Sequence, residues 1–160
     1  MGKFQSIELG AGESEFGRKF YPKCLETDSD LSLLNTNCID VITDAHKICV
    51  DDGSFDRVIL CNPFPYGFVR EEGLVLLREI VRILKSKGQV ILIASSRNPT
   101  CQPQRIKQIA NALELGTDVK IQIQVTAINL QTQYPEQKFY RFDGIETKPN
   151  TEIILQIQKS

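Results

Sequence analysis

Two hydrophobic periodicities alternate along the chain and predict alternating strands and helices. Short runs rich in apolar residues, typical of buried parallel strands, occupy residues 7–9, 23–27, 39–42, 55–61 and 89–94. Apolar residues spaced three and four positions apart predict helices over residues 13–20, 71–85 and 104–115, and a brief helix that begins at Leu31. Strict alternation of apolar and polar residues predicts two further strands, over residues 119–130 and 152–158.

In chain order these elements give the pattern βαβαββαβαββ, which predicts an α/β fold. Strands that alternate with helices favour a Rossmann-like three-layer sandwich, in which a mostly parallel seven-stranded sheet has helices on both faces. The last two strands alternate in polarity and are joined by a tyrosine-rich loop, so we expect an antiparallel pair at the C-terminal edge. No linker or internal repeat is visible in the 160 residues, and residues 1–160 are predicted to form one domain.

The first strand ends in two glycines one residue apart, within Glu8-Leu9-Gly10-Ala11-Gly12. Glycine permits a tight turn and close approach of a ligand, and the next helix offers free N–H groups to an anionic group. The dinucleotide-binding pattern G-x-G-x-x-G/A requires a small residue where Glu15 stands, which disfavours NAD or FAD. Taken alone, the two glycines fit either a nucleotide-binding turn of another kind or a bare turn in an ordinary α/β protein.

Two segments resemble motifs of the class I (Rossmann-like) S-adenosylmethionine-dependent methyltransferases. Residues 8–12 resemble the first motif, E/D-x-G-x-G-x-G, with Ser14 in place of the last glycine. Asp44-Ala45, followed by residues 52–58 (DGSFDRV), is similar to the family segment D-A…D-G-S-F-D-x-V. The resemblance covers residues 7–100 and implies a small member of the family without an N-terminal extension.

The resemblance implies that S-adenosylmethionine (SAM) is the cofactor. Glu8 would then bind the methionine amino group, and Asp28, ahead of Glu26, would accept hydrogen bonds from the ribose hydroxyls, although Asp28 could equally be a helix N-cap. Asp44 would accept a hydrogen bond from the adenine amine. The complete set of implied cofactor contacts is Glu8, Gly10, Ala11, Gly12, Glu26, Asp28, Asp44, Ala45 and Asn62.

The segment Asn62-Pro63-Phe64-Pro65-Tyr66 stands where the family has its fourth motif, beside the transferred methyl group. In the amino-methylating branch this motif reads Asn/Asp-Pro-Pro-Tyr/Phe, and the asparagine and a proline carbonyl hold the target amine. Phe64 replaces the second proline here, and the alternative is that the prolines only stiffen the turn. Asn62, Phe64 and Tyr66 are the substrate-side candidates. His46 is either a general base or an exposed residue at the start of a helix.

Composition limits the other possibilities. The formal net charge is −1, so no general basic field attracts nucleic acid. Five basic residues could still gather on one rim, namely Arg97, Arg105, Lys107, Lys138 and Arg141. No apolar stretch approaches the roughly 20 residues that span a bilayer, and no signal peptide is visible, so we expect a cytoplasmic protein.

The cysteine and histidine content disfavours a metal site. The five cysteines contain no C-x-x-C pair, and most lie beside apolar runs, so we expect reduced, buried thiols. His46 is the only histidine, so no metal is predicted.

The expected function is transfer of a methyl group from SAM to an unidentified acceptor, which is a small molecule, RNA or protein. The methyl donor is already activated, so positioning and exclusion of water carry the rate and no nucleophile–base pair is required. The alternative is a catalytically silent binding module or partner subunit that has kept the fold. The alternating strands near the end could also pair with a second copy and form a homodimer.

Overall fold

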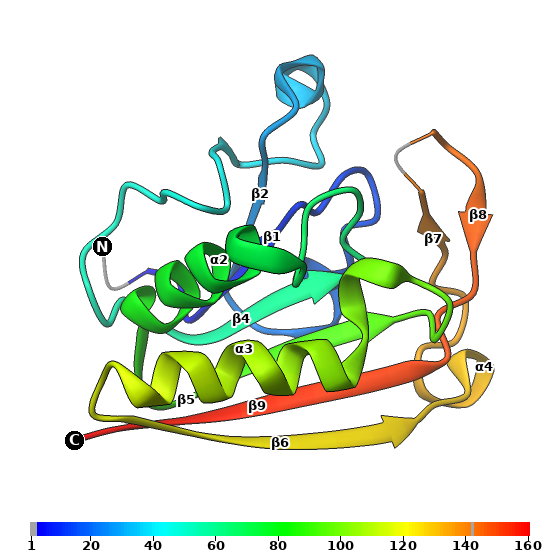
Figure 1. Cartoon of the computed structure of the whole chain (residues 1–160). Coiled ribbons are helices and arrows are strands. Elements are labelled where there is room, and N and C mark those ends of the chain that lie inside the picture. The colour runs from blue at the N-terminus through cyan, green and yellow to red at the C-terminus, as the bar shows by residue number, and fades with distance from the viewer. Residues whose placement is uncertain (1–2, 142) are drawn as a thin grey trace.

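The computed structural model describes residues 3–141 and 143–160, and a seven-stranded sheet lies at its centre (Figure 1). The strand order is β3-β2-β1-β4-β5-β9-β6, and a separate hairpin pairs β7 with β8. The sheet strands are β1 (Ser6–Leu9), β2 (Cys24–Asp28), β3 (Val41–Ile42), β4 (Phe55–Cys61), β5 (Leu84–Ala94), β6 (Val119–Ala127) and β9 (Thr151–Lys159). The hairpin strands are β7 (Phe139–Tyr140) and β8 (Glu146–Thr147).

Five neighbouring strands of the sheet are parallel. β1 pairs with both β2 and β4, so the strand order reverses between these two neighbours of β1, and ligands bind at such a switch point in open α/β sheets. β9 runs antiparallel to β5 and β6 and lies between them. The predicted parallel sheet with an antiparallel pair at its end is confirmed, with β6 as the outermost strand.

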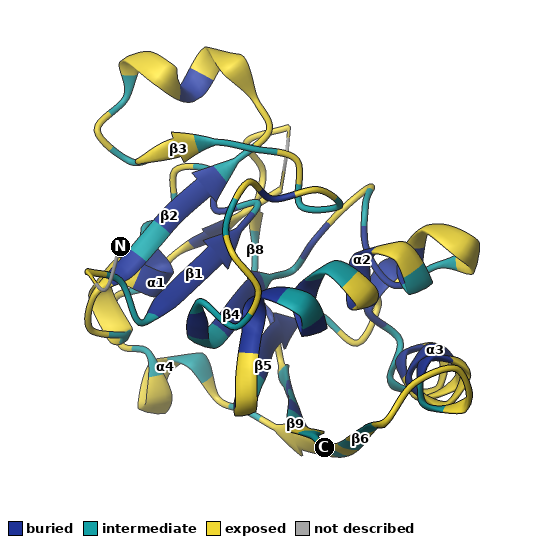
Figure 2. Cartoon of the chain, turned by 90° about the vertical axis from the view of Figure 1, so that its left-hand side faces the viewer, coloured by how far each residue is buried: buried dark blue, intermediate teal, exposed yellow. Residues whose placement is uncertain are grey.

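Helices lie on both faces of the sheet, but they cover the faces unequally (Figure 2). The helical segments are α1 (Phe16–Phe20), η1 (Leu31–Asn35, a 3₁₀ helix), α2 (Arg70–Ile83), η2 (Pro99–Cys101), α3 (Pro103–Leu115) and α4 (Leu130–Gln133). The long helices α2 and α3 cover one face, whereas the short α1 and α4 lie on the other. Leu76, Leu77 and Ile80 of α2 are completely buried in the larger core.

Two predicted helix boundaries are wrong. The first helix begins at Phe16 rather than residue 13, because Glu15 has a left-handed backbone with φ of 53°. α2 ends at Ile83, and β5 begins at once with Leu84. The pairing of β5 with β4 skips residues 85–88, so Gly88 and the two lysines before it lie in a bulge and not at the end of a helix.

The connection between β6 and β9 contains structure that the hydrophobic pattern did not predict. The predicted strand over 119–130 stops at Ala127, and the crossover segment (residues 128–141 and 143–150) adds α4 and the β7–β8 hairpin. The Tyr134 ring lies 4.9 Å from that of Phe16, and the Gln137 side-chain amide donates a hydrogen bond to the Ser14 carbonyl at 3.0 Å. The crossover segment therefore packs on α1 and on the turn before it.

Candidate functional site

A cavity of about 920 Å³ lies at the carboxyl ends of the parallel strands. One side is formed by the loops that follow β1, β2, β3 and β4, and the other by the β7–β8 hairpin (Figure 1). The cavity is lined by residues 10–14, 28–30, 32–33, 43–46, 61–66, 139–141 and 144. Most residues of the predicted site therefore meet in one place.

The glycine turn (residues 10–12) has a positive φ at both of its glycines and a close neighbouring side chain at one of them. Gly10 and Gly12 have φ of 62° and 56°, which disfavours residues with a side chain. A Cβ on Gly10 would lie 2.1 Å from the Tyr66 hydroxyl oxygen, whereas a Cβ on Gly12 would meet nothing within 4 Å. The turn thus closes against Tyr66 at Gly10 and leaves open space beside Gly12.

Glu8 and Glu26 do not line the cavity; they lie beneath the glycine turn. Both side chains are buried, and they accept hydrogen bonds from the backbone N–H groups of Gly17 and Arg18, respectively. Burial, and then the neighbouring Glu26, raises the pKa of Glu8 well above its ordinary value. Burial also raises the pKa of Glu26. In the structure these two carboxyl groups anchor the start of α1, and their contacts with SAM stay predictions.

Asp28 lines the cavity and holds the glycine turn. One carboxylate oxygen accepts from the Gly12 N–H at 2.9 Å, and the other accepts from the Asp30 N–H at 2.9 Å. The N-cap of η1 is Asp30, whose carboxylate accepts from the Ser32 N–H at 2.9 Å. The alternative interpretation of Asp28 as the helix cap is therefore wrong, and its carboxylate is fixed at the cavity wall.

Asp44 and Ala45 line the cavity after β3, and His46 is bound to Asp44. The Asp44 carboxylate accepts from the His46 N–H at 2.8 Å and lies 2.8 Å from His46 Nδ1. These two hydrogen bonds lower the pKa of Asp44, which is therefore ionised at neutral pH. His46 lies in a turn and is only partly exposed, so its interpretation as an exposed helix-start residue is wrong. Its role as a general base stays a prediction.

The hydrogen-bond acceptors of Asn62 and Pro63 are already in use. Asn62 Oδ1 accepts from the Ser95 N–H at 3.1 Å and from Asn98 Nδ2 at 2.9 Å. The Pro63 carbonyl accepts from Asn98 Nδ2 at 3.0 Å and from the Thr100 hydroxyl. Because Asn98 and Thr100 are buried, this network fixes the loop after β4 and argues against Asn62 as the holder of a target amine.

Phe64 and Tyr66 line different depths of the cavity. Phe64 is 43% exposed, whereas the Tyr66 hydroxyl donates to the Leu9 carbonyl at 3.1 Å. Burial, followed by the charge of Asp28, raises the pKa of Tyr66 well above its ordinary value, so the phenol stays protonated. The Tyr66 ring lies 6.4 Å from that of His46.

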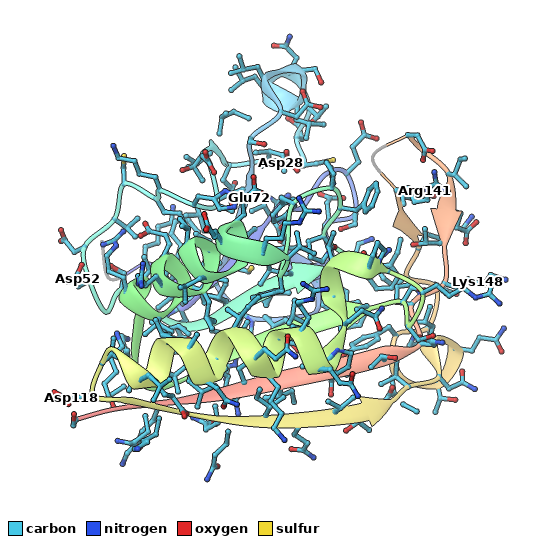
Figure 3. The ribbon with its side chains drawn as sticks, in the orientation of Figure 1. Asp28, Asp52, Glu72, Asp118, Arg141 and Lys148 are labelled. Carbon is cyan, nitrogen blue, oxygen red and sulfur yellow. The ribbon has the colours of Figure 1, made fainter. Side chains whose placement is uncertain are left out.

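The opposite wall comes from the β7–β8 hairpin, which the sequence did not predict. Phe139, Tyr140, Arg141 and Gly144 line the cavity. Figure 3 shows Arg141 on the hairpin and Asp28 at the end of β2, on different parts of the rim. Arg141 forms an ion pair with Asp143 at 2.7 Å. Of the five basic residues that could gather on one rim, only Arg141 lines the cavity.

The five cysteines are free thiols, as expected, but they are not all buried. Cys24 and Cys101 are buried, Cys38 and Cys61 are partly exposed, and Cys49 is exposed. The expectation of mostly buried thiols is therefore only partly right, because Cys49 lies in the loop between β3 and β4.

Several solved structures that are similar to this chain are SAM-dependent methyltransferases. One from Thermotoga maritima aligns with a TM-score of 0.59 and 16% identity over 97% of this chain and 82% of that chain. One from Archaeoglobus fulgidus gives 0.58 and 16% over 98% and 87%. Phosphoethanolamine N-methyltransferase 1 from Haemonchus contortus, in complex with phosphoethanolamine and S-adenosylhomocysteine, gives 0.63 and 15% over 99% and 40%.

The structural alignments and the strand order show that the chain has the Rossmann-like fold of class I methyltransferases, as its motifs predicted. No protein-family model and no curated protein matches the sequence. Within residues 3–141 and 143–160, no helix has both the length and the apolar character needed to cross a bilayer.

Proposed function

We propose that the protein is a SAM-dependent methyltransferase. The proposal rests on Asp28, Asp44 and the glycine turn, which stand at the ends of three different strands and line one cavity at the switch point of a methyltransferase fold. Independent sequence motifs thus converge in space in the arrangement that the resemblance implies.

The residues that line the cavity support binding of SAM. The open space beside Gly12 accommodates a ligand close to the backbone, and the fixed carboxylate of Asp28 suits a pair of hydroxyl groups. The ionised Asp44 can accept from an exocyclic amine, with Ala45 beside it. Four carboxylates line this side, namely Glu13, Asp28, Asp30 and Asp44. When bound, SAM supplies a methyl group on a positively charged sulfur, which these carboxylates complement.

The contribution of the protein to catalysis is then to position the reactants and exclude water. The loop of Asn62 and Pro63 is held rigidly by Asn98 and Thr100, and Tyr66 closes the floor against Gly10. Rigid walls of this kind reduce the entropic cost of bringing two reactants together. No acid–base pair is needed for this role.

A second candidate is a binding module that retains SAM without transferring its methyl group. This candidate is favoured because the acceptor oxygens of Asn62 and Pro63 already receive hydrogen bonds from Ser95, Asn98 and Thr100. Both candidates require the cofactor cavity, and they differ only in the presence of an acceptor. We prefer the enzyme because the cavity extends beyond the cofactor side to the β7–β8 hairpin.

A thermal-shift assay tests the shared requirement. SAM or its demethylated product S-adenosylhomocysteine (SAH), at 100 times its dissociation constant, should add about 2.7 kcal/mol to the free energy of unfolding. NAD at the same concentration should leave the melting temperature unchanged. Stabilisation by NAD alone would overturn the proposal. Transfer of a radiolabelled methyl group to small-molecule, RNA or protein pools then separates the enzyme from the silent module.

Two further predictions concern where the protein is located and whether it forms a dimer. The five free thiols are consistent with a reducing compartment, and the cytoplasm stays our prediction. A homodimer through the edge of β6 also stays a prediction. The Ile121 N–H of β6 is not available for pairing with a second copy, because it already donates to the Glu114 carboxylate at 2.6 Å.

A further inference from the structure

The cavity has two chemically different halves. The half formed by residues 10–14, 28–30, 32–33 and 43–46 carries four carboxylates. The half formed by residues 61–66, 139–141 and 144 carries no carboxylate among its lining residues. Instead it carries four aromatic side chains, Phe64, Tyr66, Phe139 and Tyr140. Because the first half suits the cofactor, the aromatic half is where an acceptor would lie.

The four rings differ in their exposure. Tyr66 is held by its hydrogen bond to the Leu9 carbonyl, and Phe139 is 2% exposed, with its ring 5.4 Å from that of Phe16. Phe64 is 43% exposed and Tyr140 is 49% exposed, although both line the cavity. The loop after β4 carries Phe64 and the hairpin carries Tyr140, so the exposed rings come from opposite walls. Exposed aromatic surface at a cavity is typical of a binding site.

Polar recognition in the aromatic half is limited. Asn62 Oδ1 and the Pro63 carbonyl are engaged by Ser95, Asn98 and Thr100. Arg141 is the one cation that lines this half within the described residues, and Asp143 neutralises it. Binding of a nucleic acid depends on several phosphate contacts from lysine or arginine, which this half does not offer. Recognition there must rest on stacking and apolar contact.

We propose that the methyl acceptor is a small, planar aromatic molecule without phosphate groups, which stacks against Phe64 and Tyr140. This inference rests on the proposed function, because it assigns the acceptor to the half of the cavity that SAM leaves open. Offset or edge-to-face contacts with two rings give affinity and orient the acceptor without polar contacts.

Three probes of similar size test the proposal on protein saturated with SAH. These are 2-naphthol, its phosphate ester 2-naphthyl phosphate, and decahydro-2-naphthol, which lacks the planar ring system. Titration calorimetry should give a dissociation constant for 2-naphthol at least tenfold lower than for either of the others. Equal affinity for the three, or tighter binding of a ten-nucleotide oligouridine, would overturn the proposal.

Leucine substitutions keep apolar volume and remove the flat ring. F64L and Y140L should each weaken 2-naphthol binding about tenfold and leave SAH affinity unchanged within twofold. L115A is the control, because Leu115 is 91% exposed at the end of α3 and does not line the cavity. If SAH binds and neither substitution affects 2-naphthol, this inference fails alone. If SAH does not bind, the proposed function fails, and the three probes still test the aromatic half on the protein without SAH.

Discussion

Glu8 and Glu26 lie side by side, buried beneath the glycine turn, and each accepts a hydrogen bond from the start of α1. The raised pKa of Glu8 means that the folded protein holds a proton that the unfolded chain releases above its ordinary pKa of 4.5. The unfolding free energy should therefore fall as pH rises above that value, until Glu8 is deprotonated in the folded state as well.

E8Q should flatten this dependence. Glutamine keeps an oxygen for the Gly17 N–H and carries no charge at any pH, so denaturant unfolding at pH 5 and pH 8 should give more similar free energies than in the wild type. E136Q is the control, because Glu136 is exposed. If the unfolding free energy of E8Q falls with pH as steeply as that of the wild type, the proton is held by a group other than Glu8.

Gly10 combines backbone strain with a steric conflict, and the two can be separated. G10A should destabilise the protein by about 2–4 kcal/mol, because the new Cβ meets the Tyr66 hydroxyl and φ stays positive. In G53A the backbone has nearly the same φ, 64°, but the Cβ meets nothing within 4 Å. G53A should therefore cost about 1 kcal/mol in thermal unfolding. Equal losses would contradict a close Gly10–Tyr66 contact.

Individual residues set the limit on what the sequence could predict. Asp28 and Asp44 line the cavity as expected, because Asp28 ends β2 and Asp44 stands two residues after β3, at strand ends that the hydrophobic pattern marks. The contact of Glu8 with the cofactor stays a prediction, and the hydrogen bond that Glu8 accepts from the Gly17 N–H is one that local spacing does not reveal. Asn98 was missed because its partners, Asn62 and Pro63, are distant in the sequence.

At the scale of elements, the loop after β5 fixes the loop after β4. N98A should remove the hydrogen bonds that the Asn98 amide donates to Asn62, Pro63 and Cys101, together with those that its oxygen accepts from the N–H and the hydroxyl of Thr100. Because Asn98 is buried, we expect a loss of about 1–3 kcal/mol in chemical denaturation. N111A, at an exposed position of α3, should leave stability nearly unchanged. A loss below 0.5 kcal/mol, on the order of a surface substitution, would contradict this role for the network.

Elements with clear signals were predicted well, and short ones were not. β4 covers residues 55–61 as predicted, since its apolar run lies between the turn that contains Gly53 and the proline at position 63. The β7 and β8 strands have two residues each, which is too short for any periodicity. Their pairing depends on the packing of Phe139 against Phe16, a tertiary contact that the local sequence does not contain.

At the scale of the whole molecule, the edge of β6 is the surface through which we predict self-association. The Ile121 N–H donates to the Glu114 carboxylate, and the Val119 N–H donates to the Thr117 hydroxyl at 3.3 Å, so two N–H groups near the start of β6 are already engaged. E114A should expose this N–H and increase dimer formation in sedimentation velocity. E114Q should behave like the wild type, because its amide oxygen still accepts. Identical sedimentation of the two variants would contradict a blocking role for Glu114.

The proposed function requires that the cavity at three strand ends binds the cofactor, and titration calorimetry with SAH tests this binding directly. The wild type and D118A should bind SAH alike, because Asp118 lies at the far end of the sheet from Asp28 (Figure 3). D44A should bind at least tenfold more weakly, since it loses the acceptor for the adenine amine. Absence of SAH binding to the wild type, or equal affinity in D44A, would contradict the account.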